Sequence, residues 1–213
     1  MNVKRFKELP IMGILRDVEG VAIEPLTKSI ISSGLKTVEI TMNTPKAEKL
    51  ICKMKKLAKG RLTIGAGTVL TMKDLRSALD AGAKFIVMPT LVEDVVRYCV
   101  KKSIPVFPGA MTPQEIYNAW NAGATMVKIF PAKFFGPSYI KEIKAPLKNI
   151  KLLACGGVTQ DNIQLFFSCG ASAVAFGSSV FKKEWLERRE FYRIEEVLKE
   201  LIAGFKKSKK SKV

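Results

Sequence analysis

Histidine is missing from this 213-residue chain. Without imidazole, the chain cannot pair a serine or cysteine nucleophile with histidine, and it cannot build a zinc site on imidazole ligands. Any general base must therefore be a carboxylate, a lysine, a tyrosine or a cysteine. This absence narrows the available chemistry before any motif is considered.

Paired cysteine spacing is also missing. The four cysteines, Cys52, Cys99, Cys155 and Cys169, contain no C-x-x-C pair, which favours reduced thiols over a disulfide framework or a metal site. No apolar run reaches the roughly 18 residues of a membrane span. The charged N-terminus lacks the apolar core of a signal peptide. We therefore expect a cytoplasmic protein with no membrane partner.

Acidic residues are scarce, because 19 Asp and Glu stand against 36 Lys and Arg, for a formal net charge of +17. Such a balance suits either the attraction of anionic small molecules or nucleic-acid binding. No nucleic-acid-binding motif is visible, so we expect no specific nucleic-acid partner. We interpret residues 1–205 as one domain and the basic residues 206–213 as a frayed, solvated C-terminal tail.

Short apolar segments alternate with amphipathic segments at a period of roughly 25 residues. The apolar segments predict strands at 11–16, 37–42, 62–68, 85–89, 105–110, 126–132, 151–157 and 173–179. The amphipathic segments predict helices that include 22–33, 46–58, 73–81, 92–102, 113–121 and 162–169. Thr71 and Thr112 stand where caps of two helices are expected.

Alternating strands and helices predict an α/β fold with a parallel sheet, either doubly wound or closed into a barrel. Eight repeats favour a single (β/α)8 TIM barrel. So do polar residues at the carboxyl ends of the strands, which meet at one mouth in a barrel. The first strand–helix turn carries no G-x-G-x-x-G, which leaves a dinucleotide-binding sheet without support.

Lys128 stands in the apolar run Ala124-Thr125-Met126-Val127-Lys128-Ile129-Phe130. Burial there penalises the ammonium and favours the neutral amine, a nucleophile that forms Schiff bases with carbonyl compounds. The alternative is a lysine whose stem lies along the core and whose charge reaches water. Strand alternation places Met126, Lys128 and Phe130 on one face.

Glu39 lies between Val38 and Ile40, so the same alternation points it into the barrel, as it does Lys128. A carboxylate and an amine in one low-dielectric mouth can move protons, although a buried ion pair without chemistry is the alternative. Arg16 and Thr68 end two other strands. Arg16 suits a carboxylate or phosphate, or a structural ion pair, and Thr68 suits a substrate oxygen or a helix cap.

Two glycine turns follow the last two predicted strands: Gly156-Gly157 after Cys155, and Gly177 before Ser178 and Ser179. Loops at these positions of a barrel often bind phosphate through backbone N–H groups. Two tight turns without a ligand are the alternative. The pair of turns favours the phosphate interpretation.

At this point the chain resembles a known family, the 2-keto-3-deoxy-6-phosphogluconate aldolase and 4-hydroxy-2-oxoglutarate aldolase family of class I, Schiff-base barrel aldolases. The resemblance extends from about Pro10 to Phe181. Its motifs are Gly13-Ile14-Leu15-Arg16, Val38-Glu39-Ile40-Thr41, Ile64-Gly65-Ala66-Gly67-Thr68-Val69, Pro108-Gly109-Ala110-Met111-Thr112-Pro113, Lys128-Ile129-Phe130-Pro131-Ala132 and Gly156-Gly157-Val158.

The resemblance implies a lyase that reversibly cleaves a 2-keto-4-hydroxy acid to pyruvate and an aldehyde (glyceraldehyde 3-phosphate or glyoxylate), with no metal or cofactor. Lys128 matches the Schiff-base lysine and Glu39 the proton-moving carboxylate. The matching substrate-binding positions are Arg16, Thr68, Pro89, Phe130, Gly156, Gly157, Gly177, Ser178 and Ser179. Family members are typically homotrimers, so the resemblance implies self-association and a phosphorylated keto-acid substrate as the partners.

Two substrate-side positions depart from the family pattern: Asn43, where many members carry arginine, and Cys155, where phosphogluconate-type enzymes often carry threonine. These departures leave undetermined which aldehyde the substrate releases, and the phosphogalactonate-type substrate of the same family is one alternative. Two further alternatives are a phosphate-binding barrel isomerase or epimerase that uses Glu39 without an imine, and a catalytically silent scaffold or nucleic-acid-associated protein.

Overall fold

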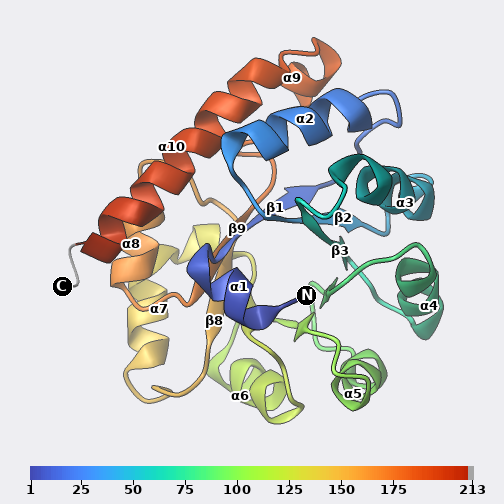
Figure 1. Cartoon of the computed structure of the whole chain (residues 1–213). Coiled ribbons are helices and arrows are strands. Elements are labelled where there is room, and N and C mark those ends of the chain that lie inside the picture. The colour runs from blue at the N-terminus through green and yellow to red at the C-terminus, as the bar shows by residue number, and fades with distance from the viewer. Residues whose placement is uncertain (211–213) are drawn as a thin grey trace.

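Nine strand segments in the described residues, 1–210, form one parallel sheet, and helices pack around its outside (Figure 1). In this computed structural model the strands are β1 (Ile11–Leu15), β2 (Thr37–Thr41), β3 (Thr63–Gly67), β4 (Ile86–Val87), β5 (Val106–Phe107), β6 (Gly109–Ala110), β7 (Val127–Ile129), β8 (Leu152–Cys155) and β9 (Ala173–Phe176). Each strand lies inside a predicted apolar segment, because a strand covered on both faces is predominantly apolar.

Pro108 explains how the sheet closes. The strand order is β5-β4-β3-β2-β1-β9-β8-β7-β6, so the two outermost strands are the two halves of the fifth predicted segment. Proline has no N–H for the ladder and separates β5 from β6. Its carbonyl still accepts a hydrogen bond of 2.8 Å from the Lys128 N–H. The sheet is therefore a nearly closed barrel, and the TIM-barrel prediction is confirmed.

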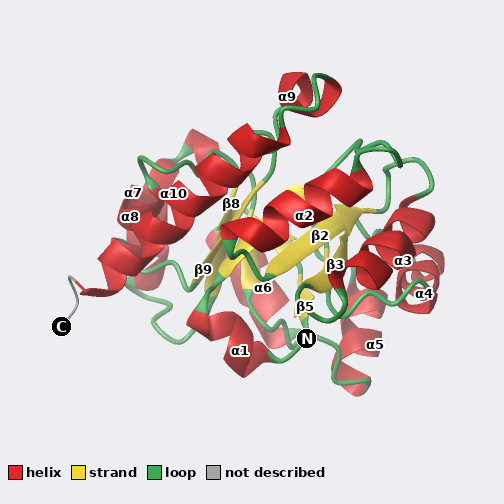
Figure 2. Cartoon of the chain, turned by 45° about the horizontal axis from the view of Figure 1, so that its top comes forward, coloured by secondary structure: helices red, strands yellow, loops and turns green. Residues whose placement is uncertain are grey.

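Ten α-helices of the described residues surround or cap the barrel (Figure 2). They are α1 (Val3–Glu8), α2 (Ile23–Ser33), α3 (Ala47–Ala58), α4 (Met72–Asp80), α5 (Glu93–Lys101), α6 (Pro113–Asn121), α7 (Gly136–Lys144), α8 (Ile163–Ser168), α9 (Lys183–Glu187) and α10 (Phe191–Lys210), with a 3₁₀ turn η1 (Ala132–Phe134) after β7. Thr71 and Thr112 form capping boxes with Asp74 and Glu115, which confirms both predicted caps.

The C-terminal part of the chain is more regular than predicted. α10 continues to Lys210, so residues 206–210 of the predicted tail belong to a helix that packs along α2 and α8. The remaining tail residues, 211–213, lie outside the described residues. No helix within residues 1–210 combines the length and apolarity needed to cross a membrane.

Two apolar clusters hold the fold together. The larger one lies between the sheet and the helices and includes Val38, Ile40, Val127 and Ile129. The smaller one fills the barrel interior. Its members are Phe6, Met12, Ile14, Phe85, Val87, Phe107, Met126, Leu153, Cys155, Ala173 and Ala175, with Met1 and Phe130 packed against them.

Helix α1, which the sequence analysis does not include, covers one end of the barrel (Figures 1 and 2). Its Phe6 packs edge-on against Phe107 with ring centroids 6.1 Å apart. Asn2 caps the helix by accepting a hydrogen bond from the Arg5 N–H. Because α1 covers the amino-terminal ends of the strands, the open mouth lies at the opposite, carboxyl-terminal end.

Candidate functional site

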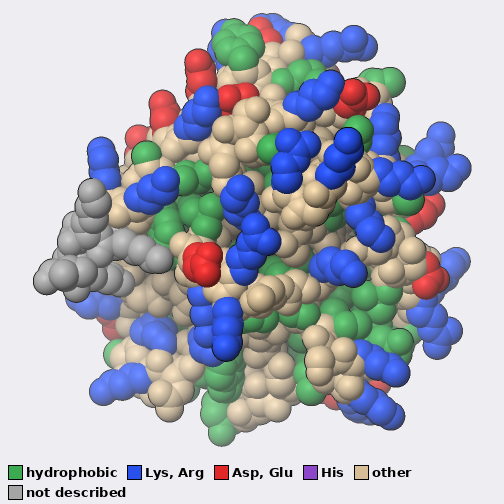
Figure 3. Space-filling model, in the orientation of Figure 1, with side chains coloured by type: hydrophobic (Ala, Val, Ile, Leu, Met, Phe, Trp, Pro, Cys, Tyr) green, Lys and Arg blue, Asp and Glu red, His purple; other side chains and the backbone are tan. Residues whose placement is uncertain are grey.

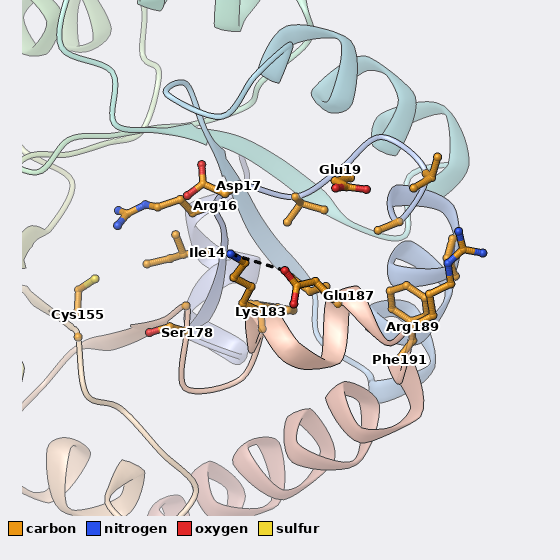
Figure 4. A pocket seen from close by; sticks show the side chains of 18 of the residues that line it. Ile14, Arg16, Asp17, Glu19, Cys155, Ser178, Lys183, Glu187, Arg189 and Phe191 are labelled. Carbon is orange, nitrogen blue, oxygen red and sulfur yellow. Dashed lines mark ion pairs between the residues drawn. The ribbon is translucent and has the colours of Figure 1, made fainter.

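A cleft of about 760 Å³ opens at the carboxyl ends of the strands. Six of the predicted site residues line it: Arg16, Phe130, Cys155, Gly156, Gly177 and Ser178. Figure 4 shows Arg16, Ile14, Cys155 and Ser178 together at one end of this cleft. The mouth predicted from the sequence therefore contains a cleft.

Lys128 lies on β7 and is only 5% exposed; it does not line the cleft itself, but its neighbour Phe130 does. Its neighbours Met126 and Phe130 belong to the interior cluster, and Val127 and Ile129 belong to the outer one, which confirms the predicted alternation. The Nζ atom is 5.1 Å from the centroid of the Phe130 ring. The lysine therefore presents its amine inside the barrel against an aromatic wall.

Glu39 lies on β2 and is 1% exposed. Its Oε2 atom has no hydrogen-bond partner within the described part of the chain. Burial raises the pKa of Glu39, and the charges of Lys128 and Arg16 oppose this rise. A buried carboxyl with an open oxygen beside a lysine is suited to exchanging a proton with a third group.

Cys155 ends β8 and is buried beside the same lysine. Burial raises the pKa of its thiol, and Lys128 opposes the rise both as a charge and as a hydrogen-bond donor. The thiol therefore stays protonated near neutral pH and acts as a soft, weakly polar part of the cleft wall.

Arg16 directly follows β1 and is exposed to solvent within the cleft. The next residue, Asp17, has a left-handed backbone (φ 53°), and its N–H donates a 3.0 Å hydrogen bond to Thr44 Oγ1. Thr44 is buried and also shares a 3.0 Å hydrogen bond with Thr41 Oγ1. Sequence reasoning missed Thr44, because no local pattern shows that it holds a loop 27 residues away.

Three predicted substrate residues, Asn43, Thr68 and Pro89, follow β2, β3 and β4 but do not line the cleft. Asn43 is exposed, whereas Thr68 and Pro89 are partly buried. Thr68 has φ 54°, which is rare for a β-branched residue and is found where surrounding structure imposes it.

The glycine turns after β8 and β9 lie side by side. Gly156 and Gly157 have φ of 100° and 75°, which other residues rarely adopt. After β9, the Val180 and Phe181 N–H groups bond to the Gly177 carbonyl and form one helical turn. Within the described residues, the N–H groups of Ser178 and Ser179 at the start of this turn donate to no protein acceptor. Such a turn can receive an anion.

The Ser179 side chain has a different role from its backbone. Its Oγ donates a 2.7 Å hydrogen bond to the Val158 carbonyl and so ties the loop after β9 to the loop after β8. Gly157, beside Val158, packs against Lys133, since a Cβ added there would lie 2.7 Å from the Lys133 Cβ. Ser179 and Gly157 therefore shape the turns without lining the cleft.

Comparison with known proteins agrees with this geometry. The model of the KDPG and KHG aldolase family matches residues 3–197. This chain belongs to that family. It is 34% identical over 176 residues to the 2-dehydro-3-deoxy-6-phosphogalactonate aldolase of Escherichia coli K12, covering 82% of this chain and 86% of the relative. It is 28% identical to the 2-dehydro-3-deoxy-phosphogluconate aldolase of Pseudomonas aeruginosa, covering 92% and 88%.

The solved structures place the aldolase in the same family. The structure described as native KDPGal superimposes with a TM-score of 0.88 at 30% identity and covers 95% of this chain and 97% of its own. A 2-keto-3-deoxy-6-phosphogluconate aldolase from Zymomonas mobilis gives 0.85 at 25% identity, covering 95% and 97%. The chain is therefore an aldolase, a carbon–carbon lyase, and the isomerase and scaffold alternatives are not favoured.

The outer wall of the aldolase cleft is a part of the site that the sequence analysis does not include. Here the loop after β1 faces α9, where Lys183 and Glu187 form an exposed ion pair of 3.6 Å (Figure 4). Glu19, Arg189 and Phe191 lie at this far end. The sequence pattern did not predict this wall, because α9 is only five residues long and shows little helical periodicity.

Proposed function

We propose that this aldolase reversibly cleaves a 2-keto-3-deoxy-6-phospho sugar acid to pyruvate and glyceraldehyde 3-phosphate through a Schiff base on Lys128. The observation that carries the proposal is the buried pair of Lys128 and Glu39, with its open Glu39 oxygen, beneath a cleft rimmed by Arg16 and by unpaired backbone N–H groups. The relatives named above act on phosphorylated acids of this class, which supports the substrate.

Lys128 is the proposed nucleophile. Its neutral Nζ attacks the C2 carbonyl carbon, and the carbinolamine loses water to give a protonated imine. The imine then accepts the electron pair of the C3–C4 bond, so the bond breaks and leaves an enamine on the lysine. Its position supports this role, because Lys128 is only 5% exposed and its Nζ lies 5.1 Å from the ring centroid of Phe130, which lines the cleft.

Glu39 is the proposed proton carrier. As C3–C4 breaks, its carboxylate takes the proton of the C4 hydroxyl, and the aldehyde leaves. The carboxyl then returns a proton to C3 of the enamine, and water hydrolyses the imine to pyruvate and the free amine. The raised pKa of Glu39 suits this exchange, because a base titrating nearer neutral pH accepts and returns protons more readily.

The rim is the proposed recognition site for the two anionic groups. The backbone N–H groups of Ser178 and Ser179 and the turn at Gly156 are suited to the 6-phosphate. Arg16, with its planar guanidinium, is suited to an anionic group near β1. Phe130 and Cys155 form the apolar wall beside the carbons. Asn43, Thr68 and Pro89 border the same mouth.

Trapping tests the covalent step. Wild-type protein is incubated with pyruvate and sodium borohydride, digested, and analysed by mass spectrometry. We expect the reduced adduct on the Lys128 peptide and none in a Lys128→Arg variant, while Lys133→Arg, a change at an exposed lysine near the mouth, still forms it. An adduct on another lysine would refute the assignment.

Substrate choice is tested by pyruvate release from the phosphogluconate-type acid, its phosphogalactonate-type epimer at C4, and 4-hydroxy-2-oxoglutarate. Both phosphorylated acids should be cleaved with a lower KM than 4-hydroxy-2-oxoglutarate. Preference for the unphosphorylated acid would contradict the phosphate assignment while leaving the Schiff base intact.

Self-association as a homotrimer is also part of the proposal. A designed cage made by fusing symmetric oligomeric domains matches this chain at 30% identity, with a TM-score of 0.89, over 96% of this chain and 75% of its own. Phe134 and Phe135 beside the mouth are 70% and 55% exposed, which suits an apolar contact between subunits. Light scattering should give three chains per particle, and a monomer would exclude the trimer.

A further inference from the structure

The loops at the end of the barrel opposite the mouth carry positive charge and no negative charge. Seven loops lead from a helix into the next strand at this end, at 34–36, 59–62, 81–85, 102–105, 122–126, 145–151 and 169–172. They contain no Asp or Glu, but they contain Lys36, Lys59, Arg61, Lys84, Lys102, Lys148 and Lys151, all exposed. We call these seven loops the basal face.

The mouth does not share this bias. Its strand-to-helix connections carry the cations Arg16, Lys46, Lys133 and Lys182 together with the acids Asp17, Glu19 and Asp161. Attraction of an anionic substrate would place the excess charge at the mouth, where the cleft lies. The basal charge therefore needs another explanation.

Helix dipoles explain only part of it. Seven helices, α2 to α8, end at this face, and each carboxyl end carries roughly half a negative charge, so together they supply on the order of three to four negative charges. The last turns of α3, α5 and α7 contribute Lys55, Lys56, Lys101, Lys141 and Lys144, against Asp80 and Glu142 in the last turns of α4 and α7. The loop cations come in addition to these, so the face remains positive.

The basal cations are also available to a partner. Each of the six ion pairs between described residues joins neighbours on one helix or at its end, and none uses a cation of the basal loops. In Figure 3, which looks at the end covered by α1, Lys and Arg side chains spread across the surface and outnumber Asp and Glu, which lie mostly toward the edge. Arg5, Lys36 and Arg61 also line a small pocket of about 180 Å³ with the hydroxyl-bearing Thr37 and Thr63.

We propose that the basal face binds the phosphate backbone of nucleic acid, without reading its sequence. Lysine-rich surfaces bind phosphates as point charges, and the small pocket is suited to one phosphate group. None of the large exposed hydrophobic side chains of the described residues lies in the seven loops, so the face lacks the apolar anchors of a membrane-surface site and the aromatic side chains that stack on bases.

The test compares two triple variants with equal change in net charge. The basal variant is Lys36→Glu, Arg61→Glu and Lys84→Glu, in the adjacent loops before β2, β3 and β4. The control variant is Lys49→Glu, Lys73→Glu and Arg76→Glu, at exposed positions on α3 and α4. Fluorescence anisotropy measures binding of labelled single-stranded and duplex oligonucleotides of about 20 nucleotides across a salt series.

We expect salt-sensitive binding by the wild type to at least one oligonucleotide. The basal variant should bind at least about tenfold more weakly, with a salt slope lower by about 2 for the single strand and about 3 for the duplex, as loss of three phosphate contacts implies. The control should lose less than about threefold. Pyruvate release should persist in both variants, because neither changes the mouth, and this shows that both remain folded.

Three results would overturn the proposal. The wild type could fail to bind either oligonucleotide at low salt. The two variants could weaken binding equally, which would assign the effect to net charge alone. Binding to phosphatidylserine vesicles without binding to either oligonucleotide would make the face a membrane-surface site instead.

Discussion

Gly67 on β3 has no room for a side chain, because the Glu39 carboxylate on the neighbouring strand occupies that space. A Cβ added to Gly67 would lie 2.4 Å from Glu39 Oε1. Real Cβ atoms do not approach an oxygen so closely, so either the carboxylate or the strand would have to move. Gly67 thus leaves the space in which the carboxylate of Glu39, the proposed proton carrier, lies.

Substitution of Gly67 tests this relationship. Gly67→Ala should displace the Glu39 carboxylate and lower kcat by about 10²-fold, the loss expected for a misplacement of about 1 Å. Borohydride trapping of pyruvate on Lys128 should persist, because the lysine is not displaced. Gly20→Ala is the control, since a Cβ there would meet only Leu50 at 3.7 Å. Equal kcat in Gly67→Ala and wild type would show that Glu39 tolerates the shift.

The pH dependence of stability tests the environment of Glu39. Burial raises its pKa in the folded protein, so its contribution to stability is fully present below the ordinary carboxyl range and is lost as pH rises through the raised value. Glu39→Gln removes this loss. The free energy of unfolding of the variant relative to wild type should therefore increase with pH by up to about 1.4 kcal/mol per unit in that window, measured by guanidinium unfolding.

Glu115 provides a control of opposite sign. Hydrogen bonds from the backbone N–H groups of Thr112 and Met111 lower the pKa of its carboxylate. The contribution of Glu115 to stability is present above the ordinary carboxyl pKa range and is lost as pH falls through its lowered pKa. Glu115→Gln should thus lose stability relative to wild type as pH rises. If the unfolding free energies of both variants, relative to wild type, changed in the same direction with pH, the opposite pKa shifts of Glu39 and Glu115 would be contradicted.

Thr44→Val tests the link between the loops after β1 and β2. The change keeps the shape but leaves the Asp17 N–H without its acceptor, at a cost of about 1–3 kcal/mol in unfolding free energy. KM should rise because Arg16 precedes Asp17, while kcat changes little. Thr27→Val, which removes a buried hydroxyl bonded to Ile23 within α2, should lower stability without affecting KM. A normal KM for Thr44→Val would exclude the positioning role.

Ser179→Ala tests the tie between the two glycine turns. Loss of its hydrogen bond to the Val158 carbonyl should loosen the proposed phosphate site and raise KM for a phosphorylated substrate by about tenfold, an energy of about 1.4 kcal/mol. KM for 4-hydroxy-2-oxoglutarate should stay unchanged. Ser168→Ala, in α8, removes an exposed hydrogen bond from a serine hydroxyl to the Leu165 carbonyl and should alter neither value. Equal increases for both substrates would argue against a phosphate site there.

The periodicity of the sequence determined the secondary structure and the orientation of the two central side chains. Strand segments such as β2 and β7 alternate between the interior and the helices with a period of two, so Glu39 and Lys128 could be placed inside the barrel from their neighbours alone. Capping boxes at Thr71 and Thr112 were equally local, because all their partners lie within three residues.

Tertiary structure decided what depends on residues distant in the chain. Three contacts join segments that are far apart in the chain: Phe6 covers the barrel end, Gly67 meets Glu39, and the Asp17 N–H bonds to Thr44. The separation of β5 from β6 at Pro108 likewise became clear only from the order of the strands in the sheet. A local pattern contains no information about such partners, because they meet only when the barrel closes. Closure of the barrel also brings lysines that are dispersed in the sequence together on the basal face, because the amino-terminal ends of all the parallel strands lie on one side.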